Sequence, residues 1–473
     1  NMLLASQHNE NVVYSVFNNH KKGDFKPYLF RSDNKGKSWK SISSNLPIRG
    51  SVYSIAEDHI DPNLLFVGTE FGLFFSLDGG AYWKQIKAGL PTIAVRDLAI
   101  QERENDLVLG TFGRGFYVLD DYSALRNINQ RNMQQEAQIF PIKDGLMFIQ
   151  GSRIGGNDKG FQGENYFTTP NPPVGVTFTY FLKESINTLE NKRKKKEAKL
   201  RNEGKDVSYP SFEDFRKEKE EKKPHLIFTI SDKSGNIIRR LSKPARAGVN
   251  RLTWDYKMFS AGPINDSDAK KGFPSSGAYV APGEYTVTMS KVIDGLSTNI
   301  AGPVSFRTKT LSDVTLPANN RRELSAFQEQ IGRLQSVIRT MNTRLNNTSK
   351  ELGQMRAAAQ GTKNDNSKIL MGIDLAQEKI TIIQRKLNGD WLAYRLDVDL
   401  PPSISDRVNR AAYGVLSSSS APTTTQREAY NIANSELEPL QKELNSFLDN
   451  DMKRMIDMLN RSGAPYTTNR KSN

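Results

Sequence analysis

The stretch Ser76-Leu77-Asp78-Gly79-Gly80-Ala81-Tyr82-Trp83 has a counterpart 44 residues earlier, Ser32-Asp33-Asn34-Lys35-Gly36-Lys37-Ser38-Trp39. Both copies fit the pattern Ser-x-(Asp/Asn)-x-Gly-x-x-Trp, and Leu-Pro follows both at the same distance. A repeat of about 40–45 residues with turn residues and an aromatic at fixed offsets is typical of β-propeller blades. The pattern therefore predicts repeated small β-sheets in the N-terminal part of the chain.

The positions of this pattern have structural roles. The Asp or Asn side chain caps backbone N–H groups of the turn, Gly supplies a positive φ, and Trp packs between neighbouring sheets. We therefore interpret them as scaffold and not as a binding or catalytic site: Ser32, Asn34, Gly36, Trp39, Ser76, Asp78, Gly80 and Trp83.

Short alternating runs around the two copies predict strands at 11–17, 28–32, 51–56, 64–69, 72–76, 95–100, 107–111 and 115–121. The pattern stops near Arg126 and leaves room for roughly three blades, whereas propellers close with about 4–8. Residues 1–126 are therefore predicted to be the C-terminal blades of a partial β-propeller. The expected partner is the set of N-terminal blades of the same protein, in the same or a cleaved chain.

Residues 127–315 show several short strand patterns, which predict a β-sandwich of immunoglobulin-like size with Trp254 and Tyr285 in its core. A charged insertion at 183–223 interrupts it, with 14 basic and 10 acidic residues. Because its basic cluster has no interleaved aromatic residues, a solvated helical insertion is favoured over a nucleic-acid site.

Residues 316–473 change to helical periodicity. Apolar residues step by three and four within 324–345, 369–387 and 433–447, which predicts an antiparallel helical bundle. Thr425-Gln426-Arg427-Glu428 resembles a capping box and places the start of the last long helix at Thr425. The predicted fold class is thus multidomain, mostly β and then α.

Composition excludes several classes of chemistry. The 473 residues include no cysteine, so disulfides, Cys-ligated zinc, iron–sulfur clusters and thiol nucleophiles are excluded. The four histidines show no ligand spacing, and no Walker loop or Gly-x-Ser-x-Gly elbow is present, so neither a metal nor a cofactor is predicted. No apolar run is long enough to span a membrane. The net charge of +14 indicates a basic surface, which serves solubility or attracts polyanions.

Charged residues near the predicted strand ends of the repeats are the candidates for a site. Carboxylates there, Asp97 among them, have the chemistry of a glycosidase pair, and the two arginines suit an anionic group. Turn capping and surface salt bridges explain the same residues, so no catalytic residue is assigned. The candidate binding residues are Glu70, Arg96, Arg114, Asp120 and Asp121.

Three sets of segments resemble one known family. Segments 67–80, 95–98 and 106–121 resemble the last blades of the bacterial BNR/Asp-box, sortilin (VPS10)-like repeat proteins, which are often called glycosyl hydrolase-like. Segments 248–255 and 282–285 are similar to the family's Ig-like sandwich, and segments 405–408 and 421–428 to its helical tail. Phe112 stands where members often have a histidine, and the arginine triad and Tyr/Glu nucleophile of the sialidase relatives have no match.

The resemblance implies an exported bacterial protein of the periplasm or cell surface. The leading hypothesis is a non-catalytic envelope protein that binds a protein or glycan ligand through its propeller. One alternative is a glycoside hydrolase whose site is completed by further blades. Another is a structural subunit of an envelope protein complex that docks through the bundle and the insertion.

Overall fold

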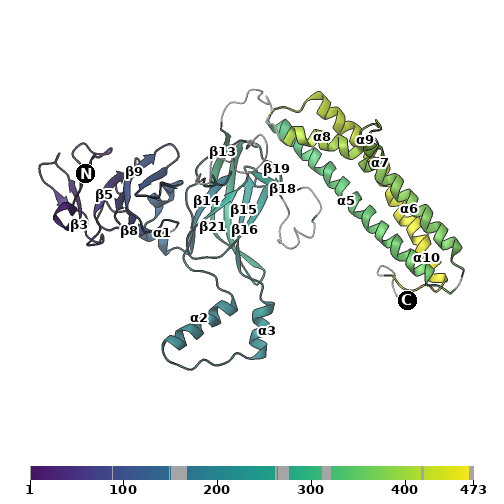
Figure 1. Ribbon diagram of the computed structural model, residues 1–473, viewed down its shortest axis with the longest axis horizontal. Coiled ribbons are helices and arrows are strands. Elements are labelled where there is room, and N and C mark those ends of the chain that lie inside the picture. The colour runs from purple at the N-terminus through teal and green to yellow at the C-terminus, as the bar shows by residue number, and fades with distance from the viewer. Residues whose placement is uncertain are drawn as a thin grey trace.

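The computed structural model describes residues 2–87, 89–148, 150, 168–260, 264, 276–311, 321–363, 365–416 and 420–467. Three parts follow one another along the chain (Figure 1): a group of small antiparallel sheets, a two-sheet region with a helical arm, and a long group of helices. The predicted order, β-rich first and helical afterwards in a multidomain chain, is confirmed at this level.

The first part contains three antiparallel sheets in which strands adjacent in sequence pair with each other. Sheet A has β1(Met2–Ala5), β2(Val13–Asn19), β3(Asp24–Ser32) and β4(Lys40–Ser41), with the 3-10 turn η1(His20–Lys22) between β2 and β3. Sheet B has β5(Val52–Glu57), β6(Leu65–Thr69), β7(Gly72–Ser76) and β8(Lys84–Ile86). Sheet C has β9(Val95–Gln101), β10(Asp106–Thr111) and β11(Phe116–Leu119). The sequence patterns missed β1, β4 and β8, because strands of four, two and three residues are too short to show a period.

Sheet B is covered on both faces. Alternate residues of its strands, such as Val67 and Phe66, pack in separate apolar clusters with sheet A and with sheet C. Gly68 in β6 lies so close to β9 that a Cβ atom there would be 2.5 Å from the carbonyl oxygen of Val95. The contact of sheet B with sheet C therefore requires a glycine at this position.

Sheets A and C each have one outer face on which no other sheet of the described residues packs. On sheet A this face has a stack of Phe17 with Tyr28 and Phe30, at ring distances of 5.0 and 5.5 Å. On sheet C, Phe116 is 80% exposed and Val118 is also exposed. We call these two surfaces the open flanks.

A two-sheet region follows η2(Tyr122–Asn127) and α1(Gln130–Gln134). One sheet has the order β12-β14-β17 and the other β13-β21-β20-β15-β16, and Trp254 and Tyr285 are buried in the core that the two sheets share. An immunoglobulin-like topology for this region stays a prediction. The strands are β12(Ala137–Ile139), β13(Gly145–Met147), β14(Val176–Leu182), β15(His225–Asp232), β16(Ile237–Pro244), β17(Gly248–Trp254), β20(Gly283–Ile293) and β21(Leu296–Thr310), with a separate pair, β18(Lys257–Phe259) and β19(Ser276–Tyr279).

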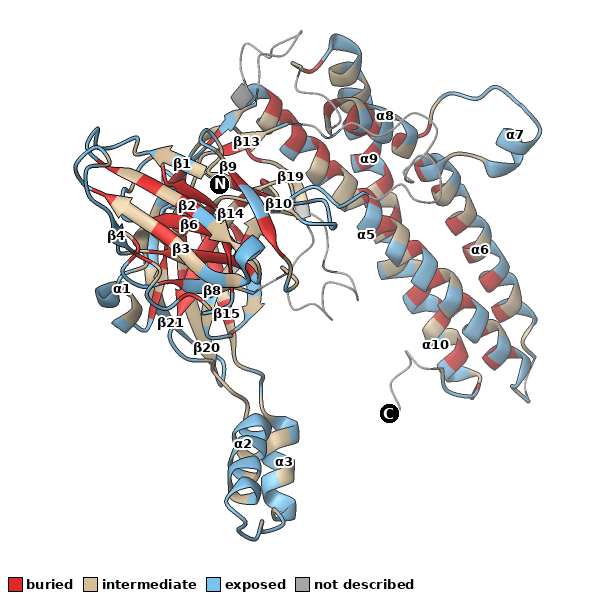
Figure 2. Ribbon diagram, turned by 60° about the vertical axis from the view of Figure 1, so that its left-hand side comes forward, coloured by how far each residue is buried: buried red, intermediate tan, exposed pale blue. Residues whose placement is uncertain are grey.

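The charged insertion forms a helical arm, α2(Leu189–Asn202) and α3(Phe212–Glu220), which projects from the sheets in Figures 1 and 2. None of the residues of α2 and α3, all of which the structure describes, is buried. Arg193 of α2 joins the two helices by an ion pair with Glu218 of α3, and it also pairs with Glu197 within α2. The prediction that 183–223 contains a solvated helical segment agrees with this arrangement.

The last part contains α5(Arg321–Gln360), α6(Ser367–Asn388), α7(Trp391–Arg395), α8(Ile404–Leu416), α9(Thr424–Ser446), the π-helical η3(Phe447–Met452) and α10(Lys453–Arg461). Residues from α5, α6, α8, α9 and α10 share one apolar core, which Figure 2 shows as inward-facing buried stripes. The predicted N-cap of α9 is wrong by two residues, because the side chain of Thr423, and not that of Thr425, accepts from the backbone N–H of Gln426. In the described part of the chain, no helix combines the length and the apolar character needed to cross a membrane.

Candidate functional site

The beginnings of β5 and β9 lie side by side at one end of sheets B and C, and both strands have a β-bulge there. In β5 the pairing with β6 skips Tyr53, and in β9 the pairing with β10 skips Arg96. A bulge turns a side chain away from its regular direction, and bulges are frequent beside functional sites. The two repeats therefore present Tyr53 and Arg96 from equivalent positions.

Four side chains meet at this end of the sheets. The Tyr53 hydroxyl donates a short hydrogen bond to the Glu70 carboxylate, which follows β6. The Arg96 guanidinium carbon lies 3.8 Å from the centre of the Tyr53 ring and 5.1 Å from that of Phe112. Burial, together with the hydrogen bond to Glu70, raises the pKa of Tyr53, so the phenol stays protonated and donates. We call Tyr53, Glu70, Arg96 and Phe112 the bulge cluster.

The predicted candidates fall into two groups at opposite ends of the sheets. Glu70 and Arg96 belong to the bulge cluster, and Arg114 lies exposed in the adjoining β10–β11 turn. Asp120 and Asp121 follow β11 at the other end, and the four residues of β11 separate them from Arg114 by roughly 15 Å. This separation of the two groups exceeds the roughly 5–9.5 Å between the two carboxylates of a glycosidase.

Asp120 and Asp121 lie in an acidic group beside the two-sheet region. Burial and the neighbouring carboxylate of Asp106 raise the pKa of Asp120. The side chain of Asp121 accepts from Ser123, and its carbonyl oxygen accepts from Arg251 at 2.6 Å. These contacts give Asp121 a role in the connection between sheet C and β17.

The two repeat turns have the same hydrogen bonds. The Ser76 hydroxyl donates to Asp78 at 2.6 Å and accepts from the Gly80 backbone, while Asp78 accepts from the backbone of Tyr82. Ser32, Asn34, Gly36 and Ser38 repeat this pattern at 3.0, 2.9 and 2.9 Å. These contacts support the interpretation of both turns as scaffold.

The two tryptophans of the repeat differ in environment. Trp83 is 2% exposed, and its indole N–H donates to the carbonyl oxygen of Ile42 in the preceding sheet at 2.7 Å. Trp39, at the equivalent position of sheet A, is 41% exposed. The expectation that both pack between sheets is therefore wrong for Trp39 in this structure, because no described sheet precedes sheet A.

Two adjacent buried carboxylates, which sequence analysis missed, join the three sheets. Glu57 accepts from Ser6 and from the Tyr14 hydroxyl of sheet A. Asp58 accepts two 2.7 Å hydrogen bonds from Arg126 and one from the Tyr122 hydroxyl, both beyond sheet C. Burial alone would raise the pKa of Asp58, but these hydrogen bonds hold it below its ordinary value. The partners lie 43–68 residues away, so no local spacing predicts them.

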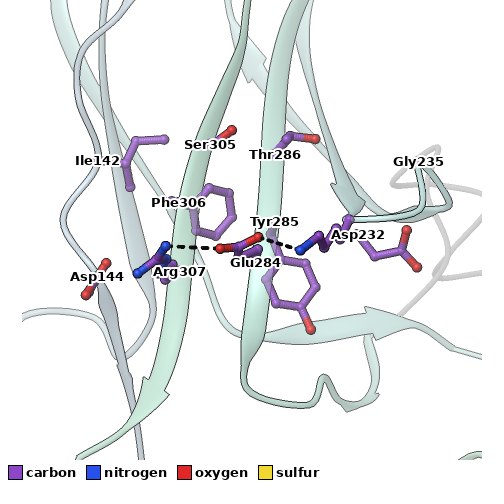
Figure 3. A pocket seen from close by; sticks show the side chains of 11 residues that line it. Ile142, Asp144, Asp232, Gly235, Glu284, Tyr285, Thr286, Ser305, Phe306 and Arg307 are labelled. Atoms are coloured by element: carbon purple, nitrogen blue, oxygen red, sulfur yellow. Dashed lines mark ion pairs between the residues drawn. The ribbon is translucent and has the colours of Figure 1, made fainter.

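A cavity of about 680 Å³ lies over β20 and β21 (Figure 3). Glu284 at its centre forms ion pairs with Lys233 at 3.3 Å and with Arg307 at 3.1 Å. The lining as a whole has three carboxylates (Asp144, Asp232 and Glu284) and two cations (Lys233 and Arg307), so the cavity offers a ligand little net charge. Elsewhere in the described residues, no group of three or more His, Asp or Glu side chains is arranged to hold a metal ion.

No protein-family model matches the sequence, and no curated protein is similar to it. Solved structures that match include the GH74 xyloglucanase from Xanthomonas campestris (18% identity over 23% of this chain and 18% of that one, TM-score 0.19). Another is the extracellular domain of BT4673 from B. thetaiotaomicron (14% identity over 66% of this chain and 31% of that one, TM-score 0.20). A third is PorZ, a surface component of the type-IX secretion system of Porphyromonas gingivalis (14% identity over 65% of this chain and 38% of that one, TM-score 0.23). The chain thus spans less than two fifths of the length of each structure, and TM-scores this low do not indicate a shared fold or function.

Proposed function

We propose that this chain belongs to an exported bacterial β-propeller protein that binds a protein or glycan ligand at the cell envelope without catalysis in this segment. The observation that supports binding is the bulge cluster, where two repeats present aromatic rings and an arginine at one end of the sheets. Sites for small ligands combine apolar ring surfaces with a few placed polar groups.

The proposal includes three domains: the last blades of a propeller at 1–126, an Ig-like sandwich at 127–315 and a helical bundle at 316–473. Its support is the repeated packing of sheet A on B and of B on C, together with the exposed open flanks. Sheet B buries Trp83 against sheet A, so the exposed Trp39 fits a further sheet of the same repeat on the flank of sheet A. That sheet would come from other blades of the same protein.

Two experiments test this proposal. Intact mass measurement and N-terminal sequencing of the native material should find further blades, in the same or a cleaved polypeptide. A lone folded monomer of 53.2 kDa would contradict the propeller. Screening the immobilised chain against envelope glycans and proteins should find binding without release of reducing sugar, and the absence of any ligand would contradict binding.

A glycoside hydrolase is the second candidate, and one observation favours it. The raised pKa of Asp120 is a property that general acids of this class share. Release of reducing sugar that disappears in the D120N variant would establish the hydrolase and replace the proposed binding function.

A further inference from the structure

The Arg96 guanidinium is held by ring faces and not by a carboxylate. Its carbon lies 3.8 Å from the centre of the Tyr53 ring, which is the distance of direct stacking. Among the residues that the structure describes, none forms an ion pair with Arg96. Stacking uses the faces of the guanidinium plane, so the N–H groups at its edge stay available to a ligand.

The surrounding residues fix this arrangement before a ligand binds. The bulge in β9 directs Arg96 toward sheet B, and the equivalent bulge in β5 directs Tyr53 toward it. Glu70 accepts from the Tyr53 hydroxyl and thereby holds the ring in place. A planar donor that is already oriented loses less entropy when it forms two parallel hydrogen bonds.

The exposed ring of Phe112 extends the surface beside the guanidinium. Phe112 is 68% exposed and lies 5.1 Å from the Arg96 guanidinium. The face of an aromatic ring carries partial negative charge and attracts the C–H groups of a flat apolar surface, and a pyranose ring has such a surface. The exposed Phe112 ring therefore offers a flat surface beside the guanidinium on which a sugar ring can pack.

From this geometry we infer that the bulge cluster binds an acidic saccharide, whose carboxylate or sulfate accepts two hydrogen bonds from Arg96 while a sugar ring packs on Phe112. The inference rests on the proposed binding function and names its ligand class. Tyr53 and Glu70 are positioning residues. The net charge of +14 favours the approach of such ligands over long range.

The test uses the full chain and a short oligosaccharide of defined charge. We expect trigalacturonate to bind in isothermal titration calorimetry, and its fully methyl-esterified form to bind roughly 10- to 100-fold more weakly, because the ester removes the charged acceptor. A sulfated galactose disaccharide separates sulfate from carboxylate as the recognised group. Affinity should fall with added salt, since the site is exposed.

Variants separate the site from general attraction to a basic surface. R96Q should lose affinity to the same degree as the ester, and R96K should lie between R96Q and the unmodified chain, because lysine keeps the charge but not the plane. R103Q is the matched control at the far end of sheet C, and the K195Q/K196Q double variant is the control for the arm; neither should change binding. Thermal unfolding of each variant checks that it folds.

Equal binding of acid and ester, or unchanged binding by a folded R96Q variant, would overturn the inference and leave the proposed binding of glycans intact. If an envelope protein binds and no saccharide does, the inference is also overturned. The proposed binding function then holds, with a protein as the ligand. If neither saccharides nor proteins bind, both the inference and the proposed function fail.

Discussion

Among single residues of the N-terminal sheets, Asp58 stands out as a carboxylate that is buried away from water. It is fully buried. Arg126 and Tyr122 donate hydrogen bonds to its carboxylate from beyond sheet C, and the backbone N–H groups of Ile60 and Asp61 also donate to it. A buried carboxylate is tolerated only when it is paired and hydrogen-bonded. The connection between sheet B and η2 therefore depends on the side chains of Arg126 and Tyr122, of which Arg126 supplies the positive charge.

The variant R126M tests this dependence. It leaves the Asp58 carboxylate buried without its cation, so we expect the free energy of unfolding of sheets B and C to fall by about 3–5 kcal/mol. Hydrogen exchange of the β5 and β6 amides measures the loss. R103Q removes an exposed arginine that pairs with Glu104 and should cost no more than about 1 kcal/mol. A similar small loss in R126M would show that the buried pair is dispensable.

The low pKa of Asp58 predicts how stability depends on pH. The ordinary value for an unfolded aspartate is about 3.9, and the folded value is lower, so the folded state binds fewer protons in acid. The contribution of Asp58 to the free energy of unfolding is therefore complete above about pH 4 and is lost as the pH falls through the pKa of Asp58 in the folded state. As the pH is lowered, the free energy of unfolding should fall less steeply in D58N than in the unmodified chain. Parallel curves for the two proteins would contradict this assignment.

At the scale of elements, the same glycine position has different surroundings in sheets B and C. Gly68 and Gly110 occupy equivalent places in the repeat, each opposite the residue that follows the bulge. A Cβ on Gly68 would lie 2.4 Å from the Ser54 hydroxyl and 2.5 Å from the Val95 carbonyl oxygen. A Cβ on Gly110 would have an ordinary contact with Asp97 at 3.4 Å, because its face is an open flank.

The pair G68A and G110A measures this difference. G68A should lower the free energy of unfolding by roughly 1–3 kcal/mol, because the added methyl group forces sheets B and C apart. G110A should be nearly neutral in this chain. Hydrogen exchange of the β6 and β10 amides in increasing denaturant compares the two variants. Equal destabilisation would mean that Gly110 is also packed against a sheet.

At the scale of the whole molecule, the arm is energetically separate from the sheets that carry it. Neither of its helices has a buried residue, and its ion pairs, such as Arg193 with Glu218, are internal. Residues just before it, including Ile186, pack on the sandwich core and belong to the sheets. The arm therefore contributes surface and charge and little to the core.

Replacing residues 188–222 by a short Gly-Ser linker tests this separation. We expect the stability of the two-sheet region to change by no more than about 1 kcal/mol, because little apolar surface is lost from its core. Thermal unfolding followed by near-UV circular dichroism, which reports the buried Trp254 and Tyr285, is the measurement. Loss of that signal in the deletion variant would show that the arm supports the sheets.

Local sequence patterns specify the order of the elements and most of the longer strands and helices. The repeat turns, the alternating strands and the three-and-four helical pattern depend on neighbouring residues, so Asp78, Gly80 and the buried stripe of α6 could be identified without tertiary information. Which distant side chains come into contact depends on how the sheets pack, and no local pattern specifies that. Tyr53 with Arg96, and Asp58 with Arg126, are 43 and 68 residues apart, and neither pair follows a local period. The exposure of Trp39 and the burial of Trp83 differ for the same reason, since packing between sheets depends on which sheet lies alongside and not on the repeat itself.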